Sequence, residues 1–390
     1  MNVAQIYALT NSVATEILGD ANPLQEDLSN VVDVGTAIFN ATSVDNYVKS
    51  LVDHIGRVIF VNRPYQGNVP NVLMDSWEYG SVLEKVRAEL PVAQENESWE
   101  LTDGAEYNPN IFRKPNVSAK FFNKRTTFEV QLSITEKQVK SSFSGVEQLN
   151  GFLSMIYNAV ERSMSIRIDG LIMRTINAMS AATIHADYGA DALTTKSGIK
   201  AVNLLYEYNN TFNPPTPLTA QGALFNPDFI RYASFRIMEY KDRLSKLSKL
   251  FNIGGTDKFT PKDFLHIVMW STFVNAANVY LQSSTFHDVY TALPGAEIVP
   301  YWQGSGTAYD FNNASKIDVT IPTTAGTTVS VSTTGILCVM FDRDALGVTN
   351  LERRVTTAYN AKADFTNNFF KFIAGYFNDY DENFIVFFVA

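Results

Sequence analysis

The run VEQLNGFLSMIYNAVERSMSIRIDGLIMRTINAMSAA, residues 146–182, decides the architecture of this chain. Its apolar residues recur at intervals of three and four, the spacing that places side chains on one face of an α-helix. They are Val146, Leu149, Leu153, Ile156, Val160, Met164, Ile168, Leu171 or Ile172, Ile176 and Met179. No proline interrupts the run, and Gly170 is its weak point. The pattern predicts one helix roughly 50 Å long, far above the usual length.

Two segments before this helix alternate between apolar and polar residues. SVLEKVRAEL (81–90) and TTFEVQLSIT (126–135) both have the period of two that is typical of half-exposed strands. The stretch between them is polar and rich in proline and asparagine, and structureless loops of this length are usually functional or binding elements. We therefore predict that 81–135 forms a long two-stranded arm that reaches off the body.

The remaining segments mix helical and strand patterns. Helices are predicted at 3–19, 43–55, 197–208, 227–250 and 271–282, the last capped by Ser271, and strands at 57–61, 264–270, 296–302 and 335–341. Helices and strands alternate loosely, so the predicted fold class is α+β. The chain closes in a run rich in aromatic residues, 359–390. Chain ends normally fray unless they are tied into a sheet, so we expect this one to end as a docked strand.

Composition excludes several classes of protein. The formal net charge is −9, which argues against a basic nucleic-acid reader, because such a protein needs clustered Lys and Arg to displace counterions. An acidic protein can still enclose nucleic acid without gripping it. The single cysteine, Cys338, lies in an apolar run and is expected to be structural. The first residues lack a signal-peptide pattern and no run is apolar enough to span a bilayer, so we expect synthesis in the cytosol.

A search for catalytic and ligand-binding motifs returns little. The four histidines are scattered without metal-ligand spacing, and no phosphate loop or nucleophile elbow is present. Two carboxylate clusters remain, one at Asp342 and Asp344 and one at Asp379, Asp381 and Glu382. Either could hold a divalent ion, but Asp also initiates turns by bonding its own backbone, and we favour the turn interpretation. We expect no catalytic residue, no cofactor site and no metal site, so the protein is predicted not to be an enzyme.

The order of parts is a short N-terminal arm, an extended hairpin, a very long helix, an α+β body and returning aromatic strands. This order resembles the major capsid proteins of tailed bacteriophages, which share the Johnson fold. NYVKSLVDHIGRVI (46–59) is similar to a stretch near the N-terminus of capsid proteins from small short-tailed phages of Gram-positive hosts. The ending from GILCVMFDRDALGV (335–348) to NFIVFFV (383–389) is similar to that of many such proteins.

The resemblance implies a division of the chain. Residues 1–60 would form the N-terminal arm and first helix, 61–140 the extended hairpin arm or E-loop with its base strands, and 141–195 the spine helix of the P-domain. Residues 196–345 would form the A-domain, and 346–390 the strands that complete the P-domain and A-domain sheets. No long scaffolding segment precedes the N-terminal arm and no immunoglobulin-like decoration follows the last strand, so we expect a separate scaffolding protein and an undecorated chain.

The function implied is that of a major capsid protein that self-assembles through hexamers and pentamers into an icosahedral shell. The shell would enclose packaged double-stranded DNA, without sequence-specific binding and without a membrane. A portal would occupy one vertex, and assembly would take place in the host cytoplasm. An encapsulin-like compartment shell, which shares the fold, and a soluble enzyme or binding protein are the alternatives.

Charged clusters are the candidate assembly interface. The arm tip is acidic, the strand that follows is basic, and a basic pair lies near the end of the chain. The residues are Glu95, Glu97, Glu100, Asp103 and Glu106 at the tip, Lys120, Lys124 and Arg125 after it, and Arg353 with Arg354 near the end. If the arm overlies a neighbour, the acidic and basic groups would come from different subunits and help to fix register. A merely solvated surface is the alternative interpretation.

Overall fold

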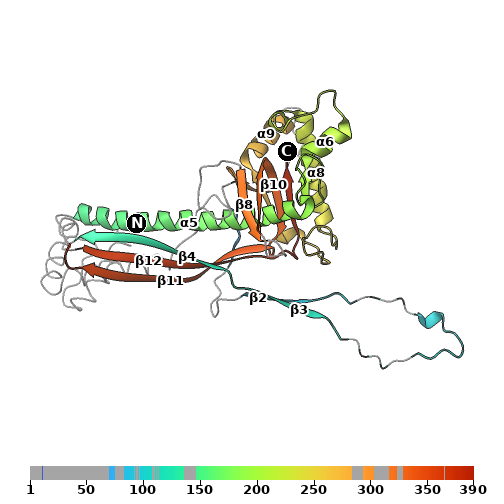
Figure 1. Ribbon diagram of the computed structural model, residues 1–390, viewed down its shortest axis with the longest axis horizontal. Coiled ribbons are helices and arrows are strands. Elements are labelled where there is room, and N and C mark those ends of the chain that lie inside the picture. Colours follow the sequence, from blue (N-terminus) through green and yellow to red (C-terminus); the bar gives the residue numbers. More distant parts are fainter. Residues whose placement is uncertain are drawn as a thin grey trace.

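One long helix lies along a narrow sheet, a second sheet rises from one end of this pair, and a two-stranded ribbon projects beyond it (Figure 1). The computed structural model describes residues 70–74, 83–91, 97–107, 114–135, 146–282, 293–302, 316–322, 328–363 and 365–390, with positions 11, 93, 95, 110 and 112. The helices predicted at 3–19 and 43–55 and the strand predicted at 57–61 lie outside the described residues, apart from Asn11.

The helix predicted from 146 is confirmed as α5, Val146–Tyr188, a single element of 43 residues. At about 1.5 Å per residue its length is about 65 Å. The hydroxyls of Thr175 and Thr183 donate to the carbonyls of Leu171 and Met179, one turn back, so these buried polar side chains are satisfied within the helix. Gly189 follows with φ +60 and its N–H donates to the His185 carbonyl, which ends the helix.

The first sheet has four strands in the order β1-β11-β12-β4. They are β1 (Leu73–Met74), β11 (Leu346–Asn360), β12 (Phe365–Asn378) and β4 (Arg125–Thr135). Residues alternate between buried and half-buried along β12, as expected where one face is covered. The covered face, with Phe128, Val130 and Phe372, meets Met164 and Ile168 of α5. The period-two pattern predicted for 126–135 therefore reflects packing against the long helix.

The second sheet has five strands in the order β5-β13-β10-β6-β7. They are β5 (Ala201–Asn203), β13 (Phe384–Phe388), β10 (Ile336–Asp342), β6 (Leu265–Trp270) and β7 (Glu297–Val299). One face packs on the C-terminal half of α5, and the other on the helices α6 (Leu204–Phe212), α8 (Pro227–Leu244) and α9 (Ser271–Gln282). Because it is covered on both sides, β10 is apolar and buried throughout.

The smaller elements complete the chain. The strands β8 (Lys316–Pro322) and β9 (Thr328–Thr334) form one antiparallel pair, and β2 (Leu83–Ala88) and β3 (Val117–Phe122) form another. Short helical turns are η2 (Glu97–Trp99), α7 (Ala220–Ala223) and η3 (Lys262–Phe264). Among the described residues, no helix has the length and apolarity needed to cross a membrane.

The C-terminus is docked, as the aromatic ending predicts. β13 is buried throughout and lies between β5 and β10. Beyond it, the N–H of Val389 donates to the Gly335 carbonyl, and the side-chain amide of Asn203 donates to the carbonyl of Ala390. Gly335 has φ +74, and a Cβ there would lie 2.6 Å from the Val389 carbonyl oxygen. The last strand is apolar because it is an interior strand of a covered sheet.

The strand pairing of the predicted arm is wrong in one respect. β2 pairs with β3, residues 117–122, and not with the segment 126–135. That segment is β4, which pairs with β12 in the four-stranded sheet. The physical reason is the apolar face of β4, which a two-stranded ribbon in water could not bury but which α5 covers. The projecting ribbon is therefore shorter than the predicted arm.

Helix boundaries differ from the predictions at three places. α6 begins at Leu204 and not at 197, because the chain first pairs as β5 and Asn203 then accepts hydrogen bonds from the N–H groups of Leu205 and Tyr206 as an N-cap. α8 ends at Leu244, well before 250. The Leu244 carbonyl accepts its hydrogen bond from the N–H of Thr260, in the loop that follows, and not from a further turn of the helix. α9 begins at Ser271 itself, so this residue is the first of the helix and not the flanking cap that was predicted, and its hydroxyl donates to the carbonyl of Pro300.

Candidate assembly interface

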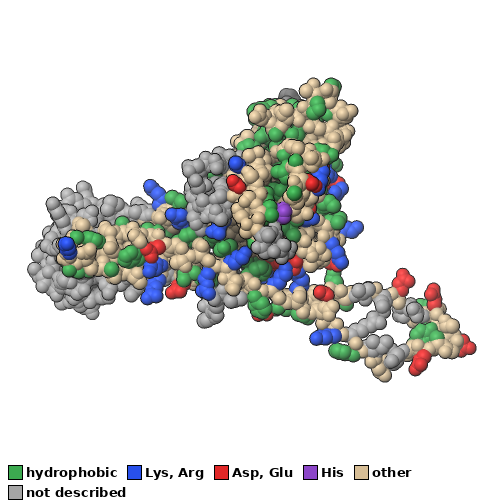
Figure 2. Space-filling model, in the orientation of Figure 1, with side chains coloured by type: hydrophobic (Ala, Val, Ile, Leu, Met, Phe, Trp, Pro, Cys, Tyr) green, Lys and Arg blue, Asp and Glu red, His purple; other side chains and the backbone are tan. Residues whose placement is uncertain are grey.

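The ribbon β2–β3 and the loop between its strands extend away from both sheets (Figure 1). Its tip exposes large apolar side chains: Trp99 is 96% exposed and Phe112 86% exposed. The five acidic residues predicted for the arm tip all lie in this loop, and Figure 2 shows acidic side chains spread around it. They are Glu95, Glu97, Glu100, Asp103 and Glu106. The tip thus presents exposed aromatic side chains in a loop where acidic residues predominate, a surface suited to a partner that is apolar and basic.

The two faces of the ribbon differ in chemistry. Successive residues of a strand point to opposite faces. Lys85 and Arg87 of β2 and Lys120 of β3 share the face turned to the body, where they are partly buried. The opposite face carries Val86 and Phe121, which are 65% and 64% exposed. The ribbon therefore uses its cationic face within its own chain and leaves its apolar face uncovered.

The cationic face is anchored on the turn between β12 and β13. Lys85 Nζ lies 2.9 Å from Asp379 Oδ2, and Lys120 Nζ lies 3.2 Å from Asp379 Oδ1. Arg87 reaches two further carboxylates, with Nη1 2.9 Å from Asp381 Oδ2 and Nη2 3.1 Å from Glu382 Oε1. Lys120 also pairs with Asp381. This group of six side chains, which we call the anchor cluster, joins the ribbon to the body.

The anchor cluster favours the ionised form of Asp379. The Asp379 side chain is fully buried, and burial by itself raises the pKa of a carboxyl group. The ion pair and hydrogen bond from Lys85, the N–H of Asp381 and the charge of Lys120 outweigh burial and hold the pKa of Asp379 below its usual range. Lys258 adds a further cation, with Nζ 2.7 Å from Glu382 Oε1.

The turn interpretation of the two carboxylate clusters is confirmed. Asp342 Oδ1 accepts a hydrogen bond from the Asp344 N–H, and Asp379 Oδ1 accepts one from the Asp381 N–H. Each aspartate thus bonds the backbone two residues on. Within the described residues, no group of three or more His, Cys, Asp or Glu side chains has the arrangement of a metal site.

Sequence reasoning missed the partners of the ribbon. Lys120 was predicted to face a neighbouring subunit, whereas its carboxylate partners belong to its own chain. Lys85 and Arg87 were not among the predicted interface residues, although both are cations on one face of a predicted strand. The ribbon carries three cations on one face and the turn carries three carboxylates. This match of charge was the signal in the sequence that could have predicted their contact.

The other predicted basic residues fall in the four-stranded sheet. Lys124 and Arg125 are exposed at the start of β4. In the register of β11 and β12, Arg353 lies opposite Phe372 and Arg354 opposite Lys371. Arg354 shares the face turned away from α5, where Lys371 lies 3.6 Å from Glu129 and sits over the ring of Phe369.

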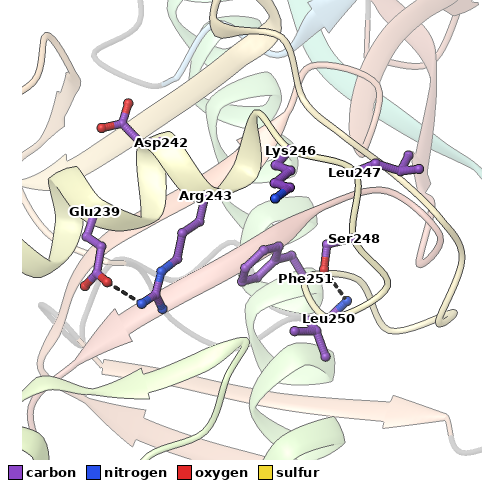
Figure 3. Close-up of a pocket in the computed structure, with 8 residues that line it drawn as sticks. All are labelled: Glu239, Asp242, Arg243, Lys246, Leu247, Ser248, Leu250 and Phe251. Atoms are coloured by element: carbon purple, nitrogen blue, oxygen red, sulfur yellow. Dashed lines mark hydrogen bonds and ion pairs between the residues drawn. The ribbon is translucent and has the colours of Figure 1, made fainter.

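A surface hollow of about 490 Å³ lies where α8 ends (Figure 3). Phe251 lies behind its rim, which carries the exposed Leu247 and Leu250, and Glu239 pairs with Arg243 at one side. The Ser248 hydroxyl accepts a hydrogen bond from the Leu250 N–H, which shapes the loop. The charged side chains of its lining are two acidic and two basic, Glu239 and Asp242 with Arg243 and Lys246.

Comparisons with known proteins agree with the architecture. Residues 10–388 match the sequence model of a family described as Phi29-like phage major capsid protein. The major capsid protein of Bacillus phage GA-1 is 22% identical over 175 residues, which are 43% of this chain and 35% of that protein. The aligned part therefore spans about a third of the length of this relative.

A solved structure supplies the fold. The chain matches the capsid structure of Staphylococcus phage Andhra with a TM-score of 0.50 and 10% identity, over 84% of this chain and 86% of that chain. At this identity the likeness establishes the fold alone. The predicted α+β capsid fold is confirmed, and the family match favours a phage capsid protein over an encapsulin-like shell or a soluble enzyme.

Proposed function

The chain belongs to the family of Phi29-like phage major capsid proteins, and on that premise we propose that its copies assemble into the icosahedral shell of a phage head. The shell encloses the packaged double-stranded DNA, and the acidic chain contains the DNA without reading its sequence. We further propose that hexamers and pentamers are the units of assembly. A separate scaffolding protein directs the assembly in the host cytoplasm, and a portal occupies one vertex.

The projecting ribbon carries the proposal. A two-stranded hairpin is marginally stable by itself in water, and this one holds Trp99 and Phe112 almost fully exposed far from the core of its own chain. A neighbouring copy is the partner that a self-assembling chain always has at hand. We therefore assign the tip to a contact between subunits, in which the aromatic side chains are covered.

The receiving surface that we propose is the face of the four-stranded sheet turned away from α5. It offers half-buried apolar side chains, Phe369 and Ile373, beside the cations Arg354 and Lys371. Lys124 and Arg125 add positive charge at one end. The same face carries two carboxylates, Glu129, which pairs with Lys371, and Glu352, which lies opposite Ile373. With Lys124 and Arg125 the cations outnumber them, so the surface is apolar and net basic. It complements a tip that is apolar and acidic, and such charge complementarity fixes register more than it adds affinity.

The division of the chain follows from the same proposal. Residues 61–140 supply the arm with its base strands, 141–195 the spine helix, and 196–345 the domain that faces other subunits around a capsomer. The segment 346–390 completes both sheets, and 1–60 forms an N-terminal arm. The family role is structural, and we propose the virion as the place where the protein acts.

Removal of the arm tip tests the proposal. Replacing residues 91–116 by an Asn-Gly turn shortens the ribbon just beyond Ala88 and Val117, which face each other across it. We expect a folded, soluble subunit, because the tip lies outside both cores, and no closed particles by electron microscopy or light scattering.

A second variant distinguishes the effect of the length of the arm from the effect of its side chains. A flexible Gly-Ser linker of the same length in place of 91–116 keeps the reach of the arm but removes its rings and carboxylates. We expect this variant also to fail to close shells. Normal shells from either variant, with circular dichroism unchanged, would show that the arm tip is not an assembly contact.

A further inference from the structure

We propose that the turn between β12 and β13, residues 379–383, is an electrostatic latch that sets the direction of the arm before subunits meet. This inference rests on the proposed function for its role in the shell, but the latch itself belongs to the single subunit. Its parts are the six residues of the anchor cluster, namely Lys85, Arg87 and Lys120 on the ribbon and Asp379, Asp381 and Glu382 on the turn.

The turn is a rigid base for such a latch. The N–H of Asp379 donates to the Ala345 carbonyl over 2.7 Å, and the N–H of Gly254 donates to the Tyr380 carbonyl over 2.8 Å. The Thr256 hydroxyl donates to the Asp381 carbonyl over 3.0 Å. A Cβ on Gly254 would lie 1.9 Å from Asp381 Oδ1, so glycine is required for this close approach. The backbone that carries the carboxylates is therefore held in position by the body, through contacts that do not involve the arm.

The turn connects the two sheets, so the latch links the direction of the arm to the arrangement of the sheets. β12 before it belongs to the four-stranded sheet, and β13 after it belongs to the five-stranded sheet. Lys258, in the loop that follows α8, shares the Glu382 carboxylate with Arg87. The arm is thus anchored at the junction of the two sheets and of this loop. A shift of one sheet against the other would change the direction in which the arm points.

Among the described residues, most of the side-chain contacts between the ribbon and the body are ion pairs. Phe122 packs on Phe377 with ring centroids 5.1 Å apart, and Lys85 Nζ donates to the Asp344 carbonyl over 2.8 Å. Lys85 Nζ also lies over the ring of Phe377, 5.6 Å from its centroid. The ion pairs of the anchor cluster add to these contacts, while Val86 and Phe121 face solvent. The cations of these pairs are 23–42% exposed, so molar salt weakens the hold, although less than it weakens fully exposed ion pairs.

The two sides of the latch are unequally buried. The Asp379 side chain is 0% exposed and Glu382 8%, whereas Lys85 and Arg87 are each 23% exposed. Lifting the arm would leave buried carboxylates without their cations, and uncompensated buried charge is costly. The docked direction is therefore the favoured state of a free subunit, and the arm meets its neighbour already oriented, which reduces the ordering cost of association.

A distance measurement on unassembled subunits tests the latch. Cys338 is fully buried and burial raises the pKa of its thiol far above the usual range, so cysteines placed at the exposed positions Ala105 and Lys246 can be spin-labelled selectively. We expect a narrow distribution of distances between the arm tip and the end of α8, measured by double electron–electron resonance at low salt. In Arg87→Gln with Lys120→Gln, we expect the distribution to become at least about twice as broad.

The matched control is Lys196→Gln with Arg231→Gln, which removes two cations from exposed ion pairs with Asp191 and Asp228. This control should keep the narrow distribution. Molar salt should broaden the distance distribution of the labelled protein without any of the Gln substitutions. This sample needs no substitution in the latch, so a folding defect caused by such a substitution cannot explain the result. Equal widths in all of these samples would overturn the latch. Because no shell is needed, a failure of shell assembly leaves this result intact and counts against the proposed function alone.

Discussion

Two carboxylates, Asp379 and Asp169, show how burial and charge act in opposite directions on single residues. Asp379 is fully removed from water and Asp169 is half-buried, and removal from water disfavours the ionised form. At Asp379 the cations of the ribbon outweigh burial and keep its pKa below the usual range. At Asp169, on α5, burial raises the pKa to about 6. The first carboxylate stabilises the fold when it is charged, and the second does so when it is protonated.

The sign of each effect gives a pH dependence. A depressed pKa contributes stability that is present above the unfolded pKa and is lost as the pH falls through the folded pKa, so the contribution of Asp379 is lost in acid, below about pH 4. A raised pKa contributes stability that is present below the unfolded pKa and is lost as the pH rises through the folded pKa. The contribution of Asp169 is therefore lost between about pH 4 and about pH 6.

The substitution Asp169→Asn tests the second statement. Asparagine cannot ionise, so the variant avoids the half-buried negative charge that the native chain carries at pH 8. We expect the melting temperature of the variant relative to the native protein to be higher at pH 8 than at pH 4. Asp318→Asn, at an exposed position of β8, controls for the loss of one negative charge. The same difference for Asp169→Asn at both pH values would contradict the assignment.

At the scale of elements, α5 is the part on which the others are arranged. Its middle covers the four-stranded sheet through Met164 and Ile168, and its last turns pack against the five-stranded sheet, where Tyr188 meets the ring of Phe388 at 5.8 Å. One unbroken helix therefore fixes the relative position of two sheets. A break in the helix should affect the whole fold and not one domain of it.

Proline at Val160 tests this role of the helix. Val160 is fully buried within α5, and proline there removes an internal hydrogen bond and clashes with the preceding turn, at a cost of about 3 kcal/mol or more. We expect Val160→Pro to give insoluble protein or a large loss of helical circular dichroism.

Val160→Ala is the control for the proline variant. It removes two methyl groups but keeps the backbone, at about 0.8 kcal/mol for each buried carbon. It should remain soluble, with unfolding in urea shifted to lower concentration. A soluble proline variant as stable as the alanine variant would mean that 146–188 does not act as one rigid element.

At the scale of the whole molecule, positive charge has two separate uses. Lys85, Arg87 and Lys120 are bound within the chain by the anchor cluster. Lys124 and Arg125 are exposed at the start of β4 and, in our proposal, meet the acidic tip of a neighbour. Substitutions in the first group should change the direction of the arm, and substitutions in the second should change only the association of subunits.

Reversing Lys124 and Arg125 to Glu tests the association. An exposed ion pair contributes only about 0–1 kcal/mol, but a shell repeats it in every copy, so assembly should respond much more strongly than folding. We expect a higher protein concentration to be needed for shells, measured by light scattering, and a melting temperature of unassembled subunits within about 1 °C of the native value. Higher salt should weaken native assembly through screening.

Lys246→Glu with Lys249→Glu, after the end of α8, makes the same change in net charge elsewhere and should assemble at the native concentration. If the Lys124 and Arg125 reversal assembles as readily as native protein at low salt, the electrostatic contact between tip and sheet is wrong. The capsid family assignment would be unaffected by that result.

The sequence by itself determined the elements whose periodicity is long or strict. The spacing of apolar residues from Val146 onward defined α5, and the short, mainly apolar runs at 264–270 and 335–341 defined β6 and β10. A docked, apolar C-terminus also followed from sequence, because a frayed chain end would expose its aromatic side chains to water. Each of these predictions depends on a pattern within a single segment, so no knowledge of distant parts of the chain was needed.

The tertiary structure decided which segments meet. The alternation in 81–90 and in 126–135 is the same, yet β2 pairs with β3 while β4 joins β12, because the apolar face of β4 lies against α5. The anchor cluster likewise joins Arg87 to Asp381 across most of the chain length. Strand pairing and ion pairing depend on which surfaces the folded body covers and on the distance between charges in space. A sequence records the charges and the apolar faces, and only the packed chain selects their partners.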